Sequence, residues 1–248
     1  MNLTRFFSKR RNKILFAVCL LLLAGFLAGI ILNVVLRANG ALPDAEFRHR
    51  LLYALLFLLV SAAILAGEAI LHIRFPLVLE LMLLVFVFAC LMGGTVFGLY
   101  AHIPVWDKIL HTASGVLFSA VGLSLAHAMT KGLSGMRRIV VCLLIAAFFS
   151  LSVGYLWEIY EFSYDSLVSG GNLQRWQAGI LTQLPDGSVA VTNARAALLD
   201  TMYDLIVNLI GTVLFLAVMF FILRARAEIL DAFAVERDRK ASSPQEEK

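Results

Sequence analysis

The sequence predicts an all-α membrane protein with six transmembrane helices, and three observations support this fold class. Hydrophobic residues fill 60% of the 248 positions, whereas charged residues fill only 15%, well below the roughly 25% of an average soluble domain. Six apolar stretches are long enough to cross a bilayer core, which takes about 20 helical residues. Only helices and closed barrels satisfy every backbone group in lipid, and stretches of this length favour helices.

The predicted spans divide the chain into a transmembrane domain, residues 14–223, and two charged ends. The spans cover residues 14–36, 51–73, 77–100, 109–130, 139–160 and 202–223. A basic tail of residues 1–13 precedes them, and a charged tail of residues 224–248, expected to begin as a helix, follows. The connections are short except for a small polar loop at 37–50 and an outer loop at 162–201. Residues 179–193 of the outer loop alternate around a Pro-Asp-Gly turn, which predicts a β-hairpin. This hairpin could cap the outer polar site or be a surface feature without a function.

The distribution of basic residues predicts the orientation in the membrane. With the N-terminus in the cytoplasm, 15 of the 21 Lys and Arg residues fall on the cytoplasmic side, as the positive-inside rule requires. An even number of spans returns the C-terminus to the same side. We therefore expect both termini in the cytoplasm of a multi-pass protein, and most of the acidic residues on the outer side.

Seven polar residues gather at the outer ends of the last three predicted spans. They form stripes three or four residues apart, a spacing that places them on one helical face: Asp107 and His111, Glu158 and Glu161, and Asp200, Asp204 and Asn208. A glycine follows deeper in each span, at Gly115, Gly154 and Gly211, where it would let another helix approach closely. A carboxylate near hydrocarbon costs free energy unless it is paired, hydrated or bound. The stripes therefore predict a common polar pocket.

Three interpretations of this pocket are open. Carboxylates and a histidine can surround a divalent cation, with zinc, manganese or iron favoured by the His and acid mixture and magnesium or calcium by oxygen alone. The acids can instead share protons and pair with Lys108, Arg175 or Arg195 in a network that locks the helices together. The pocket can also hold a polar ligand such as a lipid headgroup.

Several other classes of function are disfavoured. The sequence has no basic stripe interleaved with aromatic residues, so we expect no nucleic-acid partner. The three cysteines lie inside apolar runs without a CxxC spacing, which argues against a disulfide framework or a thiolate zinc site. No serine sits in a GxSxG frame, and no HExxH motif is present. The sequence therefore favours a binding protein over an enzyme.

The polar stripes also resemble a known family. Asp107-Lys108-x-x-His111, Glu158-x-x-Glu161 and Asp200-Thr201-x-x-Asp204-x-x-x-Asn208-x-x-Gly211 resemble the YjdF-type bacterial inner-membrane proteins, a family of unknown function, and more distantly the VanZ-like family. The resemblance covers roughly residues 100–215. It implies a bacterial cytoplasmic (inner) membrane protein with a cell-envelope role, and the same seven residues as the site. Glu161 stands where a VanZ-like protein typically has glutamine, and the long outer loop is a further departure.

Our leading hypothesis is a membrane protein whose outer pocket binds a divalent metal of unspecified identity or an envelope-lipid headgroup or precursor. We expect His111, Glu158 and Asp204 to be the inner metal ligands. Asp107, Glu161, Asp200 and Asn208 would then complete the pocket. Two alternatives are a metal-dependent enzyme acting on a lipid-linked substrate and an ion-coupled transporter. The enzyme would use Glu158 or Glu161 as general base, and the transporter would need a polar path toward Glu68 or Glu80.

Overall fold

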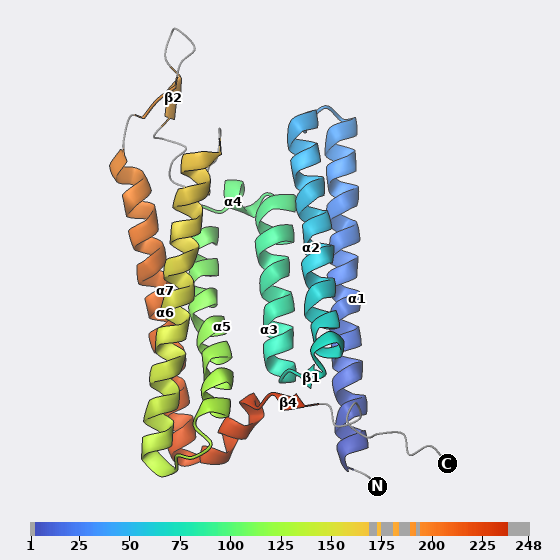
Figure 1. Cartoon of the computed structure of the whole chain (residues 1–248). Coiled ribbons are helices and arrows are strands. Elements are labelled where there is room, and N and C mark those ends of the chain that lie inside the picture. Colours follow the sequence, from blue (N-terminus) through green and yellow to red (C-terminus); the bar gives the residue numbers. More distant parts are fainter. Residues whose placement is uncertain (1–2, 169–172, 175–180, 184–188, 192–193, 238–248) are drawn as a thin grey trace. The chain divides into compact units, whose positions relative to one another are not determined.

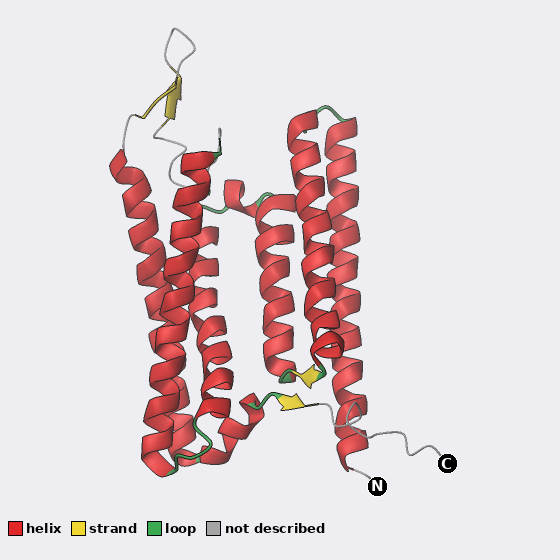
Figure 2. Cartoon of the chain, in the orientation of Figure 1, coloured by secondary structure: helices red, strands yellow, loops and turns green. Residues whose placement is uncertain are grey.

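The computed structural model describes residues 3–168, 173–174, 181–183, 189–191 and 194–237. Helices account for most of these residues, as Figure 2 shows. The chain divides into two compact units. The first contains the residues up to His102 together with those from Ala232 onward, and the second runs from Ile103 to Asp231.

The structure confirms the predicted fold class. Six helices are long and apolar enough to cross a membrane, and they cover Arg11–Ala38, Asp44–Glu68, Leu77–Val96, Trp106–Met129, Gly135–Leu167 and Ala197–Ala225. Each overlaps one predicted span. Many large apolar side chains on these helices are exposed, such as Phe16, Leu59 and Phe221, and in a membrane they contact lipid. The orientation of the termini stays a prediction.

The first unit consists of three transmembrane helices and short flanking elements (Figure 1). Its helices are α1 (Leu3–Ala38), α2 (Asp44–Leu71), α3 (Leu77–Val87) and the four-residue α4 (Leu99–His102). Strand β1 (Ile73–Arg74) pairs antiparallel with β4 (Glu236–Arg237). Helix α2 ends where His72 adopts a left-handed conformation with φ of +50°, and Pro76 precedes α3.

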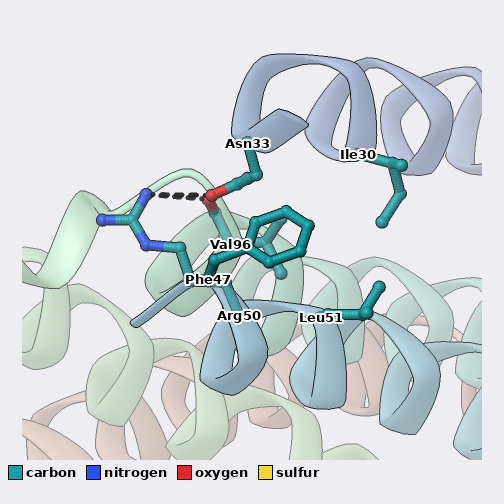
Figure 3. A pocket seen from close by; sticks show the side chains of 6 residues that line it. All are labelled: Ile30, Asn33, Phe47, Arg50, Leu51 and Val96. Atoms are coloured by element: carbon teal, nitrogen blue, oxygen red, sulfur yellow. Dashed lines mark hydrogen bonds between the residues drawn. The ribbon is translucent and has the colours of Figure 1, made fainter. Parts of the chain in front are cut away.

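Helix α3 continues as a π-helix, η1 (Phe88–Val96), which the sequence did not predict. Its widened turn packs Met92 and Val96 against Ala54 and Phe57 of α2 in the core of this unit. Asn33 of α1 donates to the Val96 carbonyl at 3.0 Å and so links two helices. Arg50 donates to the Asn33 side chain and to the same carbonyl, each at 3.3 Å. Figure 3 shows both residues at a small pocket beside the end of the π-helix.

Two acids of the first unit, the half-buried Glu68 and the buried Glu80, share one arginine. Arg11 of α1 donates to Glu68 of α2 and to Glu80 of α3, each at 2.5 Å. Glu68 also accepts the backbone N–H of Phe75 at 2.8 Å, and the side chain of Glu80 is only 1% exposed. Arg11 therefore joins the first transmembrane helix to the next two.

The second unit is a bundle of three long helices with a hairpin (Figure 1). The helices are α5 (Trp106–Met129), α6 (Gly135–Leu167) and α7 (Ala194–Ala225). Strands β2 (Leu181–Gln183) and β3 (Val189–Val191) pair antiparallel, so the predicted hairpin exists. After α7 the chain forms the 3-10 helix η3 (Ala227–Phe233) rather than the continuing α-helix that the sequence suggested.

Glycines let the three helices of this bundle meet at backbone distance. A Cβ atom added to Gly115 of α5 would collide with the backbone carbonyl of Asn208, and one added to Gly211 of α7 would collide with the carbonyl of Thr112. A Cβ atom added to Gly154 of α6 would lie 2.8 Å from the side-chain oxygen of Asn208. These are the three glycines that the sequence singled out. Their contacts bring the polar stripes of α5, α6 and α7 toward a common axis.

We expect Gly115→Ala to destabilise the bundle, because the new methyl group meets backbone rather than a movable side chain. Overpacking of this kind costs about 1–3 kcal/mol, and the protein's Tm in detergent should fall by several degrees. The matched control is Gly67→Ala in α2, where an added Cβ meets nothing within 4 Å. A Tm for Gly115→Ala equal to that of the control would contradict the close approach of α5 and α7.

Arg11→Met should lower the free energy of unfolding much more than Arg37→Met. Removing Arg11 leaves Glu80 buried without its cation, at a cost of about 2–3 kcal/mol after allowance for the 21% exposure of the Arg11 side chain. Arg37 pairs with Asp44 at 2.9 Å, but both side chains are about half exposed or more, and such pairs contribute less than about 1 kcal/mol. Unfolding in a detergent–SDS titration measures both. Equal losses would show that the Arg11 contacts are not structural.

Candidate functional site

The structure brings all seven predicted polar residues together inside the second unit. None of them is more than 8% exposed. Helix α5 supplies two, helix α6 supplies two and helix α7 supplies three: Asp107, His111, Glu158, Glu161, Asp200, Asp204 and Asn208. We call this group, together with Lys108, the polar cluster. That the cluster binds a ligand stays a prediction.

Helical spacing explains why the stripes converge. Asp200, Asp204 and Asn208 are four residues apart, and Gly211 lies on nearly the same face of α7. The Gly211 contact with α5 turns that face toward the bundle axis. Gly115 does the same for the α5 face that carries Asp107 and His111. Neighbouring apolar residues such as Ile109 and Ile206 point outward and are exposed.

Lys108 is the cation of one half of the cluster. Its Nζ atom lies 2.5 Å from Asp200 Oδ1 and 2.6 Å from Asp204 Oδ2, and 3.5 Å from Asp107 Oδ2. The sequence analysis named Lys108, Arg175 and Arg195 as partners for the acids. The structure confirms Lys108. Arg175 lies outside the described residues, and Arg195 is exposed.

His111 stands between the acids of the three helices. Its Nδ1 atom lies 3.6 Å from Glu158 Oε1. On the other side of the ring, Nε2 lies 3.7 Å from Asp204 Oδ1 and 4.0 Å from Asp107 Oδ1. These separations are longer than hydrogen bonds. Each ring nitrogen therefore faces a carboxylate across a gap that an inserted atom could bridge.

Glu158 is buried without a hydrogen bond to either of its carboxylate oxygens. Its side chain is only 4% exposed. The hydroxyl of Thr201 is near enough to interact with it electrostatically, yet their geometry does not meet the criteria of a hydrogen bond. Glu161, one turn further along α6, accepts the Trp157 indole N–H at 2.8 Å on Oε1, while its Oε2 atom has no partner. Buried polar atoms are normally satisfied, so these oxygens require an explanation.

A hydrogen-bonded polar layer lies next to the cluster. Asn208 of α7 donates to Ser114 of α5 at 3.0 Å. Ser150 of α6 donates to the Gly115 carbonyl at 3.0 Å and shares a 2.8 Å hydrogen bond with Thr212 of α7. These contacts join all three helices. This layer contains no acid, so it differs from the network of shared protons and ion pairs that the sequence left open as an alternative; the Lys108 ion pairs belong to that network.

The sequence analysis missed three contributors to the cluster's surroundings. Trp157 is four residues before Glu161, so helical spacing could have indicated their hydrogen bond. Thr201 follows Asp200 directly and accepts a 2.9 Å hydrogen bond from Gln174. Gln174 is 5% exposed, and its backbone N–H donates to Asp165 at 3.0 Å. The start of the outer loop thus folds back onto α6 and α7. No local sequence pattern predicted this contact.

Two further histidines, His49 and His102, have local partners in the first unit. His102 Nδ1 lies 2.7 Å from the carbonyl oxygen of Gly98, and the ring of His49 packs on Tyr53 with centroids 4.7 Å apart.

Comparison with protein families places the chain. The model of a family described as "Predicted membrane protein (DUF2238)" matches residues 14–225. The chain belongs to the DUF2238 family. This confirms the resemblance to the YjdF-type proteins of unknown function. The more distant VanZ-like resemblance stays a prediction. No curated protein and no solved structure matches the chain.

The DUF2238 match extends over all six membrane-spanning helices and includes the whole polar cluster. Within the described residues, two sets of side chains place donor atoms within 4.8 Å of one another: Asp107, His111 and Asp204, and His111, Glu158 and Glu161. Both sets contain an imidazole nitrogen and carboxylate oxygens, the donors that suit zinc, manganese and iron. Chemically, the cluster can hold a cation or move a proton.

Proposed function

We propose that this DUF2238 protein binds a divalent transition-metal ion within the α5–α7 bundle, held by His111, Glu158 and Glu161. The observation that carries the proposal is Glu158, which is buried in a membrane-spanning helix with both carboxylate oxygens lacking a hydrogen bond. An ionised or polar group in this state costs several kcal/mol of free energy (about 2–7 for a neutral group). A metal ion would replace the missing partners and account for the arrangement.

The charge balance supports a cation. Among the described residues, the cluster holds five carboxyl groups and one ammonium group, that of Lys108. Like-charged carboxylates a few ångströms apart cannot all remain ionised without compensation. A divalent ion beside Glu158 would add two positive charges on the side of His111 that faces away from Lys108's aspartates. Asp204, the third ligand expected from the sequence, faces the opposite nitrogen of His111.

We place the protein in the bacterial cytoplasmic membrane, following the family resemblance and its six apolar helices. A phosphoethanolamine-type lipid headgroup is an alternative ligand, because its ammonium group could also compensate the acids. An ion-coupled transporter stays an untested prediction.

A metal-dependent enzyme acting on a lipid-linked substrate is the second candidate, and one observation favours it. Trp157 is half exposed on α6 and donates to the buried Glu161. Its ring packs against Tyr160, which packs in turn against Tyr164. Aromatic side chains of this kind lie at membrane interfaces. The hydrogen bond from Trp157 to Glu161 would therefore connect the cluster to the level of the lipid headgroups. Glu158 or Glu161 would then accept the proton of an attacking water.

Glu158→Gln should abolish or strongly reduce metal binding, because an amide oxygen carries no charge and is a poor ligand for these ions. The measurement is elemental analysis of the purified full-length protein after incubation with zinc or manganese and removal of unbound metal. Glu46→Gln, which changes a half-exposed acid paired with Arg50, is the matched control and should bind as the parent does. Metal-free parent protein, or equal binding by all three proteins, would refute the proposal.

A different measurement separates the enzyme from the binding protein. If the protein transforms a lipid-linked substrate, the lipid extract of a Glu158→Gln strain should match that of a deletion strain and differ from that of the parent. Identical extracts from all three strains would count against the enzyme and leave the metal-binding proposal intact.

A further inference from the structure

We propose that Lys108 occupies the second cation position of a cluster built for two, so that the native protein binds one metal ion. This inference rests on the proposed function. It explains why the cluster holds two overlapping sets of metal-ligand donors, and why only one of them would be loaded.

The two sets lie on opposite sides of one imidazole ring. Glu158 faces Nδ1 of His111 at 3.6 Å, and Glu161 completes this first set. Asp204 and Asp107 face Nε2 at 3.7 and 4.0 Å and form the second set. His111 therefore belongs to both sets, and the carboxylates of each set face a different nitrogen of its ring.

The ammonium group of Lys108 already neutralises the second set. It lies 2.6 Å from Asp204 and 3.5 Å from Asp107, the two carboxylates of that set, and 2.5 Å from Asp200 beside them. A lysine ammonium carries three donors and a compact positive charge, which match three carboxylates. Lys108 lies three residues before His111 in α5, less than one helical turn away. The helix backbone therefore holds its side chain close to the second set.

In the part of the chain that the structure describes, no lysine or arginine forms an ion pair with the glutamates of the first set. The structure gives Lys108 ion pairs with aspartates only. Glu158 has no hydrogen bond on either oxygen, and Glu161 has none on Oε2. The two sides of the ring thus differ in one respect. The Lys108 ammonium group compensates the charge of the aspartates, whereas no ion pair of Lys108 reaches the glutamates.

Removing the ammonium should open the second position. In Lys108→Met the aspartates lose the ammonium group that pairs with all three of them, and Asp204, already facing His111 through Oδ1 without a hydrogen bond, becomes a ligand through either oxygen. A second divalent ion would then replace Lys108. Because both ring nitrogens of His111 would then bind a metal, the ring would give up its remaining N–H proton to solvent and bridge the two ions as an imidazolate. Lys108→Arg keeps the charge and is the matched control.

The experiment is zinc binding by the full-length protein in detergent, measured as zinc per chain by elemental analysis after removal of free metal. We expect one zinc in the parent, one in Lys108→Arg and two in Lys108→Met. One zinc in Lys108→Met would overturn the role of Lys108 and leave the proposed function standing. No zinc in the parent would overturn the proposed function, and this inference with it.

A second variant decides the question if Lys108→Met fails to fold. Lys108→Met/Asp200→Asn removes one positive and one negative charge together, and Asp200 belongs to neither donor set. This protein retains all the ligands of both positions and should also bind two zinc ions. A single ion there would overturn the inference.

Discussion

The close contact between α5 and α7 is the constraint on which the rest of the second unit depends. Gly115 and Gly211 each place their backbone against the backbone of the other helix, at positions where a side chain has no room. In lipid no hydrophobic force drives helices together, so small residues and polar contacts must hold them. Because the stripes of α5 and α7 share faces with these glycines, the contact that packs the helices also buries the acids.

The bundle separates satisfied from unsatisfied polar groups by level. At Asn208, Ser114, Ser150 and Thr212, hydrogen bonds link all three helices. One or two turns away, around His111 and Glu158, the separations exceed hydrogen-bond length and oxygens lack partners. The hydrogen-bonded layer and the polar cluster therefore occupy adjacent levels of the same bundle. The hydrogen bonds of the first join α5, α6 and α7 next to the second.

Sequence reasoning recovered the features that depend on local spacing. Span positions, the polar stripes and the role of Gly115 all follow from hydropathy and from a period of about 3.6 residues. It did not recover features that depend on which helices meet. The pairing of Arg11 with Glu80 joins residues 69 positions apart, and the fold of Gln174 onto Thr201 spans a loop. The π-helix at Phe88–Val96 shows no hydropathy signal, because one extra residue per turn leaves composition unchanged.

The two units treat buried acids differently, and the contrast favours a functional origin for the polar cluster. In the first unit one guanidinium serves Glu68 and Glu80, and a backbone N–H adds a third donor. This is sufficient to stabilise helix packing. In the second unit Lys108 pairs with three aspartates, while carboxylate oxygens of Glu158 and Glu161 lack hydrogen-bond donors. Well-packed apolar residues commonly equal or exceed buried ion pairs in stability, so packing alone gives no reason for acids beyond those that Lys108 contacts. Glu158 and Glu161 are the two acids in excess, and the cation that we propose would give them a role.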